Sequence, residues 1–503
     1  MMTTLKALVA DHPSEARALG APERDWLTYG GLRDLATRTE ESLRSFGIGA
    51  SDRVAIVLPN GPDMASSFFT IAQAATTAPL NPNYREDEFA FYLEDLNARA
   101  LVVAAGYDGP ALAAGQRLGL TILRLNAHAA AGDFTLLSDG ETDAADKGSP
   151  TAQDVALILH TSGTTSRPKI VPLLQSNVAA SAQHIAESLS LTAEDRCLNV
   201  MPLFHIHGLV AAVAATFAAG GSIFCTPGFN AMNFFAMMSQ SRPTWYTAVP
   251  TMHQAILSRA DRNAEVIKDV PLRFLRSSSA SLPAQVMAAL NKTFNAPVIE
   301  AYGMTEAAHQ MCCNRLDMQK PGSVGVAAGP DVAIGHESED RLIDGIGEVC
   351  ISGPNVTPGY ESNPEANAKS FFIANNKRWF RTGDQGTLDE DGFLHLTGRL
   401  KEIINRGGEK ISPLEVDGVL MDHPAIAQVV TFALPHHKLG EEVAAAVVLR
   451  EGEQADERSI RDFAADRMAD FKVPRKVVIL DEIPKGATGK MQRIGMAEKL
   501  GLV

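Results

Sequence analysis

A short apolar run that breaks into small hydroxyl residues, glycine and lysine constrains this chain more than any other stretch. Residues 157–160, Leu-Ile-Leu-His, have the composition of a buried strand, and Thr-Ser-Gly-Thr-Thr-Ser-Arg-Pro-Lys follows at residues 161–169. Small side chains let backbone N–H groups close on an anion, and Lys169 adds a cation. The stretch predicts a phosphate-binding loop, although its spacing differs from the Gly-x-x-x-x-Gly-Lys-Ser/Thr loop. An ordinary Ser/Thr turn after a strand is the alternative.

Strand-like and helix-like runs alternate on the N-terminal side of this loop. Residues 32–46 carry leucines at roughly helical spacing, and the glycines that follow end the pattern. Compact apolar runs at residues 53–58 and 100–104 are typical of buried strands, and residues 64–77 again resemble a helix. Strands that alternate with helices imply a parallel sheet built from βαβ units. We therefore expect an α/β fold.

The same alternation continues beyond the loop. Residues 127–154 are rich in Ala, Gly, Asp, Ser and Thr, so we expect them to form a surface connection into it. After the loop, residues 177–189 have a helical pattern, and residues 197–201 and 221–225 are candidate buried strands.

A domain boundary is predicted between residues 398 and 399. At 503 residues the chain exceeds what one hydrophobic core usually serves, so two or more domains are expected. Residues 381–386 and 389–392 read as turns of a small β region, and the chain after residue 398 is first charged and glycine-rich. We expect a large N-terminal domain over residues 1–398, with parallel-rich βαβ sheets and a small β subdomain. A small α+β C-terminal domain would follow over residues 399–503.

The charge balance excludes partners that are bound by excess positive charge. The formal net charge is −14, which disfavours unspecific attraction to nucleic acid or to anionic membranes. Anionic ligands must therefore be held by local arrangements of donors and cations. The longest apolar run, residues 209–219, is too short to cross a bilayer.

Cysteine usage and the two ends of the chain favour a cytoplasmic protein. The five cysteines are an odd number without paired metal spacing, and they fit a reducing compartment. Residues 1–10 lack the basic start and apolar core of a secretory leader, and the C-terminal Gly-Leu-Val is not a Ser-Lys-Leu address.

The loop resembles the phosphate loop of the adenylate-forming acyl-CoA synthetases, commonly Thr-Ser-Gly-Thr-Thr-Gly-x-Pro-Lys. One position departs from this pattern, because Ser166 stands where glycine is usual. The resemblance extends from about Leu27 to about Lys490, in a superfamily that also contains luciferases and peptide-synthetase adenylation modules. Three further pieces, at residues 201–208, 300–311 and 405–413, look most like the oxalyl-CoA synthetases.

The resemblance implies a two-step reaction that activates a carboxylic acid with ATP. The carboxylate takes AMP with loss of pyrophosphate, and CoA then displaces AMP to give an acyl-CoA. In this family the Thr305 hydroxyl meets phosphate, Glu306 binds a magnesium ion (Mg2+), and Asp384 accepts from both ribose hydroxyls. The implied nucleotide-binding residues are Thr161, Ser162, Gly163, Thr164, Thr165, Lys169, Ala301, Tyr302, Thr305, Asp384, Arg399 and Lys490. Alone, such residues would be an ordinary turn before a helix, a surface salt bridge and a solvated tail charge.

The resemblance also assigns roles to the C-terminal domain, which is mobile in this family. Lys490 is the expected catalytic cation between the substrate carboxylate and the α-phosphate. Lys401 is the expected hinge, and the loop Gly407, Gly408, Glu409 and Lys410 is expected to meet CoA after adenylation. Acetylation of Lys490 by a lysine acetyltransferase would erase the charge that the mechanism uses.

Two histidines precede the long apolar run. On a strand, His205 and His207 would share one face, and such a pair forms half of a metal site when further ligands are nearby. The resemblance implies instead that His205 is a catalytic-site residue on the wall between the acyl and thiol sites, and that His207 enters the acyl pocket.

The expected acyl pocket is polar, which favours a small diacid over a fatty acid. Its candidate side chains are His207, Ser278 and Ser279 in the serine-rich run 277–281, and His309, which we place on the same helical face as Glu306. Malonyl-CoA synthetases resemble one another in carrying arginine where this chain has Ala301. Oxalate is therefore the first choice of substrate. Malonate, short- or medium-chain acids, an amino-acid-activating enzyme, a luciferase-type oxygenase and a non-catalytic nucleotide-binding protein are the alternatives.

Overall fold

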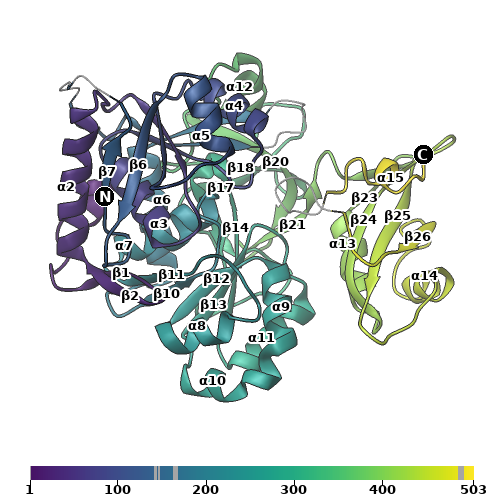
Figure 1. Ribbon diagram of the computed structural model, residues 1–503. Helices are drawn as coiled ribbons and strands as arrows, with labels where there is room; N and C mark the ends of the chain where they lie inside the picture. The colour runs from purple at the N-terminus through teal and green to yellow at the C-terminus, as the bar shows by residue number, and fades with distance from the viewer. Residues whose placement is uncertain (1, 141–143, 145–147, 162–167, 485–491) are drawn as a thin grey trace. The chain divides into compact units, whose positions relative to one another are not determined.

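The computed structural model describes residues 2–140, 144, 148–161, 168–484 and 492–503 (Figure 1). Its contacts divide the chain into two compact units. The larger unit comprises Met1–Leu282, Val286–Val332 and Ile351–Phe371, and the smaller unit comprises Pro283–Gln285, Ala333–Cys350 and Phe372–Val503. In the described part of the chain, no helix is long and apolar enough to cross a membrane.

A seven-stranded sheet of the larger unit carries the loop strand. Its order is β7-β6-β5-β3-β4-β8-β9, with parallel pairing from β6 to β8 and antiparallel pairing at both edges. The strands are β3 (Arg53–Val57), β4 (Thr76–Pro79), β5 (Ala100–Ala104), β6 (Thr121–Ala127), β7 (Phe134–Ser138), β8 (Val155–Thr161) and β9 (Lys169–Leu174). The α/β prediction is confirmed.

The sequence pattern located several of these elements and misplaced others. The predicted helix at 32–46 is α2 (Tyr29–Ser45), and the predicted strand at 100–104 is β5. The predicted helix at 64–77 was too long, because α3 (Pro62–Ile71) ends and β4 begins at Thr76. The predicted surface connection at 127–154 was partly wrong, because β7 pairs with β6 inside it.

A nine-stranded sheet, also in the larger unit, carries the predicted site residues Ser278, Ala301, Tyr302 and His309. Its order is β16-β15-β14-β13-β12-β10-β11-β1-β2. The strands are β1 (Arg17–Ala21), β2 (Arg24–Thr28), β10 (Arg196–Asn199), β11 (Ser222–Cys225), β12 (Trp245–Ala248), β13 (Phe274–Ser278), β14 (Val298–Met304), β15 (His309–Cys313) and β16 (Val326–Ala327). Strands β10 to β14 run parallel, and β15 returns antiparallel to β14.

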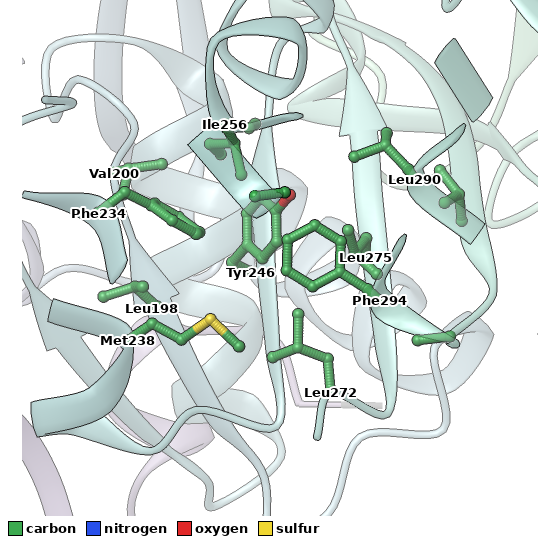
Figure 2. Packing of buried hydrophobic residues seen from close by; sticks show 14 of the residues in the cluster. Leu198, Val200, Phe234, Met238, Tyr246, Ile256, Leu272, Leu275, Leu290 and Phe294 are labelled. Atoms are coloured by element: carbon green, nitrogen blue, oxygen red, sulfur yellow. The ribbon is translucent and has the colours of Figure 1, made fainter. Parts of the chain in front are cut away.

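One face of this sheet is covered by an apolar cluster under four helices (Figures 1 and 2). These helices are α8 (Phe234–Ser241), α9 (Pro250–Ala260), α10 (Ala264–Asp269) and α11 (Ala284–Phe294). The Tyr246 ring of β12 lies between Phe234 and Phe294, with ring centroids 5.1 and 6.3 Å away (Figure 2). Because side chains alternate along a strand, Leu275 of β13 joins this cluster while Arg276 points to the opposite face.

Two five-stranded sheets lie wholly or mostly in the smaller unit, because a few end residues of β17, β18 and β19 in the first sheet belong to the larger unit. The first has the order β17-β18-β20-β19, with β21 paired to β20, and the second has the order β23-β22-β25-β24, with β26 paired to β25. The first comprises β17 (Asp331–Gly335), β18 (Gly347–Ser352), β19 (Phe371–Ala374), β20 (Lys377–Leu388) and β21 (Leu394–Arg399). The second comprises β22 (Ile404–Arg406), β23 (Glu409–Ile411), β24 (Ile426–His436), β25 (Gly440–Leu449) and β26 (Lys476–Ile479).

Helices α13 (Pro413–Met421) and α14 (Glu457–Ala465) complete the core of this second sheet. Residues 381–386, predicted as a turn, instead lie inside the long strand β20, whereas residues 389–392 do form a turn closed by Gly392 N–H and Asp389 C=O. The predicted boundary at 398/399 falls within β21, and it stays a prediction about which part of the chain moves as a body.

Candidate active site

The two ends of the predicted phosphate loop are held together by strand pairing. Thr161, the last residue of β8, is the direct antiparallel partner of Lys169, the first residue of β9. The loop therefore starts and ends at one edge of the seven-stranded sheet. Four of the residues predicted to bind phosphate, Ser162, Gly163, Thr164 and Thr165, lie outside the described residues.

A tyrosine that the sequence did not single out joins two predicted site residues. The Lys169 ammonium lies 4.1 Å from the centroid of the Tyr360 ring. The Tyr360 hydroxyl donates to Glu306 Oε1 over 2.9 Å, and both residues are 6% exposed. A half-buried cation thus joins a buried aromatic ring and a buried carboxylate, from three distant segments, in one cluster.

The segment that follows β14 differs from the prediction. Thr305–Ala307 is a single 3-10 turn, and Ala308 and His309 then take positive φ values of 47° and 102°. Residues with this backbone end a right-handed helix, so the chain reverses and β15 pairs with β14. The prediction that His309 lies on one helical face with Glu306 was therefore wrong.

Gly303 allows the close approach at this reversal. A Cβ added there would lie 1.9 Å from the His309 carbonyl oxygen, and the register between β14 and β15 shifts next to it. Ala301 and Tyr302 lie on β14 and are buried, as residues of a central strand are.

Three residues predicted for the acyl pocket do come together. His207 Nδ1 lies 3.0 Å from Ser279 Oγ, and the His207 ring centroid lies 5.0 Å from that of His309. Ser279 has a positive φ of 72°, so strained backbone occurs on both sides of the cluster. Ser278, also predicted here, instead donates its hydroxyl to the Ala301 carbonyl over 2.8 Å.

His205 and His207 do not share a strand face. His207 begins a π-helix, His207–Ala214, which leads into α7 (Ala215–Ala218). His205 lies in the preceding turn, where its N–H meets the Pro202 carbonyl and its own carbonyl accepts from Leu209 N–H. The strand geometry on which the metal half-site alternative depended is therefore wrong.

Sequence reasoning also missed a buried arginine beside His207. Arg276 of β13 is 0% exposed, and its Nη2 donates to Gln310 Oε1 over 3.2 Å. Its Nη1 lies 3.4 Å from both Thr247 Oγ1 and His207 Nε2. An arginine between Phe274-Leu275 and the serine-rich run 277–281 was the available signal.

The predicted ribose and CoA residues lie in the smaller unit. Asp384 of β20 faces Arg399 of β21 in the ladder, and Arg399 Nε lies 3.2 Å from Asp384 Oδ1. Gly407 and Gly408 have positive φ values of 62° and 101° between β22 and β23, a backbone that glycine adopts readily. Lys410 pairs with Glu337 over 2.7 Å.

Two other predicted residues of this unit are placed differently. Lys401 lies in the turn after β21, two residues beyond Arg399, and Lys490 lies outside the described residues.

The family follows from comparison with known proteins. The protein-family model described as AMP-binding enzyme matches residues 5–361 of this sequence. The family model described as AMP-binding enzyme C-terminal domain matches residues 415–490. The chain belongs to the AMP-binding enzyme family. The resemblance to adenylate-forming acyl-CoA synthetases is confirmed, and this AMP-binding enzyme is an AMP-forming acid–CoA ligase that uses ATP, CoA and a carboxylic acid.

Relatives and solved structures match this AMP-binding enzyme over nearly its whole length. It is 44% identical over 497 residues to an oxalate–CoA ligase of Arabidopsis thaliana, covering 96% of each chain. It is 41% identical over 476 residues to an oxalate–CoA ligase of Saccharomyces cerevisiae, covering 89% of this chain and 86% of the relative. The crystal structure of ATP-bound MatB from Rhodopseudomonas palustris superposes with a TM-score of 0.88 at 27% identity, covering 99% of both chains.

Proposed function

We propose that this AMP-binding enzyme is an oxalate–CoA ligase. The observation that carries the proposal is the polar cluster of the buried His207 and His309 with the half-buried Ser279, where an enzyme for fatty acids would need an apolar tunnel. A second carboxylate can be buried only where donors or a cation meet it. The similarity to two oxalate–CoA ligases supports the same substrate.

The reaction has two displacements. In the first, an oxalate oxygen attacks the α-phosphorus of ATP, the new O–P bond forms, and the bond to pyrophosphate breaks. In the second, the CoA thiolate attacks the acyl carbon of oxalyl-AMP, and AMP leaves with the oxygen that oxalate supplied. Oxalyl-CoA, AMP and pyrophosphate are the products.

The larger unit would hold the triphosphate and its magnesium ion. Lys169 and the loop would meet the phosphates, Tyr302 the adenine and Thr305 a phosphate oxygen. Glu306 suits Mg2+, because one fixed carboxylate together with nucleotide oxygens and water satisfies this hard cation, and the Tyr360 hydroxyl orients that carboxylate. A magnesium ion there supplies charge neutralisation on the phosphates.

The smaller unit would supply the groups that alternate between the two steps. Asp384 would accept from the ribose hydroxyls, with Arg399 beside it. Lys490 would stabilise the charge that develops between the substrate carboxylate and the α-phosphate. Rotation about Lys401 would then bring residues 407–410 to CoA. His205 would separate the acyl and thiol sites.

A panel of acids tests the substrate directly. AMP release with ATP and CoA is measured for oxalate, malonate, acetate, butyrate and hexanoate. Oxalate is expected to give the highest kcat/KM, and a higher value for any other acid would refute the assignment.

His309→Ala tests the pocket. Loss of a donor to a buried carboxylate lowers kcat/KM for oxalate by at least about ten-fold, while butyrate and hexanoate are spared because they place no charge there. An equal loss for every acid would mean that His309 supports the fold or the magnesium site instead.

Lys490→Ala tests the division of labour between the two steps. Adenylation should be abolished, while thioester formation from supplied oxalyl-AMP stays largely intact, because the lysine acts only in the first step. Single-turnover assays of each step make the comparison. Equal loss of both steps would contradict the assignment.

Lys401→Pro should have the opposite effect to Lys490→Ala on the two steps. Proline fixes φ and removes a donor, so it should block the rotation and slow the second step while sparing the first. Normal CoA-dependent turnover would count against the hinge.

Acetylation of Lys490 and a cytoplasmic location stay predictions.

A further inference from the structure

Arg276 is a fully buried cation, and no carboxylate among the described residues forms an ion pair with it. It is 0% exposed, and its Nε has no hydrogen-bond partner among the residues that the structure describes. Burial lowers the pKa of Arg276, and the described side chains that oppose this shift are the thiols of Cys313 and Cys197. Carboxylates balance other arginines of this unit, as Asp195 does for Arg273 at 3.0 Å. A buried guanidinium without such a partner is costly, so it requires an explanation.

The contacts of Arg276 fix its orientation. Gln310 Oε1 accepts from Nη2 at 3.2 Å, and the amide nitrogen of Gln310 donates to Ser188 Oγ and to the Ala328 carbonyl. The Gln310 amide is therefore locked with its oxygen toward the guanidinium. Nη1 is directed at Thr247 and His207.

This orientation determines the proton on His207. A guanidinium N–H can only donate, so His207 Nε2 faces Arg276 as an acceptor. Thr247 Oγ1, 2.6 Å from Nε2, accepts from Arg276 and must give its own proton to the same nitrogen. The proton of the neutral His207 ring therefore resides on Nδ1, which donates to Ser279 Oγ.

The chain of donors ends at Ser279. Because Ser279 Oγ accepts from His207, its own hydroxyl proton points away from the imidazole, where it can meet an acceptor of the substrate. Arg276, Thr247, His207 and Ser279 thus present one directed O–H group with a fixed positive charge behind it. This arrangement suits a carboxylate oxygen.

We propose that Arg276 is a specificity-determining positioning residue that makes the acyl pocket select acids with two negative charges. It acts through His207 and Ser279 by setting the direction of their hydrogen bonds, and its own charge balances the second carboxylate. The inference rests on the proposed oxalate–CoA ligase function. It adds a cation to that pocket and states which property of the substrate the pocket reads.

The test compares oxalate with oxamate, which has the same heavy-atom skeleton but only one negative charge. The KM for oxalate and the inhibition constant of oxamate are measured for the wild type, Arg276→Met and Arg276→Lys. The wild type should bind oxalate in preference to oxamate. Arg276→Met should lower that preference by at least about ten-fold, since it removes the charge that one ligand needs and the other does not. Arg276→Lys keeps a positive charge but lacks the planar set of guanidinium donors. It should retain more of the preference for oxalate than Arg276→Met does.

Arg273→Met is the matched control. It removes an arginine three positions earlier whose charge is balanced by Asp195, so the oxalate-to-oxamate preference should not change. If Arg276→Met weakens both ligands equally, or if neither Arg276 variant folds, Arg276 serves only the fold and the proposal is overturned. Failure of the oxalate assignment is distinguishable, because the wild type would then prefer another acid in the panel.

Discussion

Tyr360 is the side chain that connects the two residues predicted to bind the phosphates and the magnesium ion, Lys169 and Glu306. Its ring lies beneath the Lys169 ammonium, and its hydroxyl donates to the Glu306 carboxylate. Two predicted ligands of the ATP–magnesium complex thereby share one support. A carboxylate that is oriented before the metal binds loses less freedom when it does.

Tyr360→Phe removes the hydroxyl and keeps the ring. A hydrogen bond to a charged group contributes about 1.5–3 kcal/mol, so adenylation should fall by about ten- to hundred-fold, with a raised magnesium requirement. ATP–pyrophosphate exchange measured against Mg2+ concentration tests this. Tyr29→Phe is the control, because its hydroxyl bonds to the Gly221 carbonyl away from the site, and its magnesium requirement should stay normal. An unchanged magnesium requirement in Tyr360→Phe would contradict the role.

Glu300 gives the larger unit a pH dependence. Burial raises the pKa of this carboxyl from 4.5 to about 7, and the hydrogen bond from Leu282 N–H opposes the shift. Between pH 4.5 and about 7, the Glu300 carboxyl therefore holds a proton in the folded state that it has lost in the unfolded state. Stability from this group is fully present below pH 4.5 and is lost as the pH rises through 7.

Glu300→Gln should remove this slope. Between pH 5.5 and pH 8 the variant should gain about 2 kcal/mol of unfolding free energy relative to the wild type. Urea unfolding at the two pH values gives the comparison. The opposite slope from His253, whose pKa burial lowers to about 4, is present in both proteins and cancels. Parallel pH profiles of the two proteins would exclude Glu300 as the source.

At the scale of elements, the reversal between β14 and β15 places His309 beside His207 rather than beside Glu306. It does so with two consecutive residues of positive φ, Ala308 and His309. An L-residue in this backbone costs roughly 1–2 kcal/mol relative to the right-handed region. The hairpin keeps this strain because β15 is paired and fully buried.

Neighbouring alanines allow that strain to be measured. Ala307 and Ala308 are both fully buried, but only Ala308 has a positive φ. Glycine at either position loses one methyl group, and at Ala308 it also relieves strain. Ala307→Gly should therefore destabilise the protein by about 1–2 kcal/mol more than Ala308→Gly, as measured by urea unfolding. Equal losses would mean that the turn is relaxed.

The elements that the sequence predicted best are those whose apolar spacing is local. Helix α2 and strand β5 have clear patterns and were found. Strand β4, Thr-Thr-Ala-Pro, lacks such a pattern because its burial comes from both neighbouring strands. β7 was missed in a segment of small polar residues for a similar reason, since its pairing with β6 supplies its order.

The site residues that were missed depend on partners distant in the chain. Tyr360 is 54 positions from Glu306, and Arg276 is 69 positions from His207. No local pattern links such residues, and motif spacing found only those that belong to continuous motifs. The turn at Ala308 was mispredicted because alanine favours helix, and only the pairing of β15 with β14 overrides that preference.

At the scale of the whole molecule, local cations must capture anionic ligands against an unfavourable overall charge. The chain carries a net charge of −14, while ATP, CoA and the acid are all anions. Lys169 and Arg276 supply positive charge inside the larger unit, and Arg399 supplies it in the smaller one. Each unit has its own core, so each can hold its cations in place by itself.

The five cysteines allow the opening of the two compact units to be measured separately by thiol labelling. All are free and buried, so a thiol reagent reaches each one only when the structure around it opens. Cys350 belongs to the smaller unit, whereas Cys197, Cys225, Cys312 and Cys313 belong to the larger one. Each unit thus contains at least one buried thiol that reports its own unfolding. The labelling rates of the two sets of cysteines reveal whether the two units unfold together or one before the other.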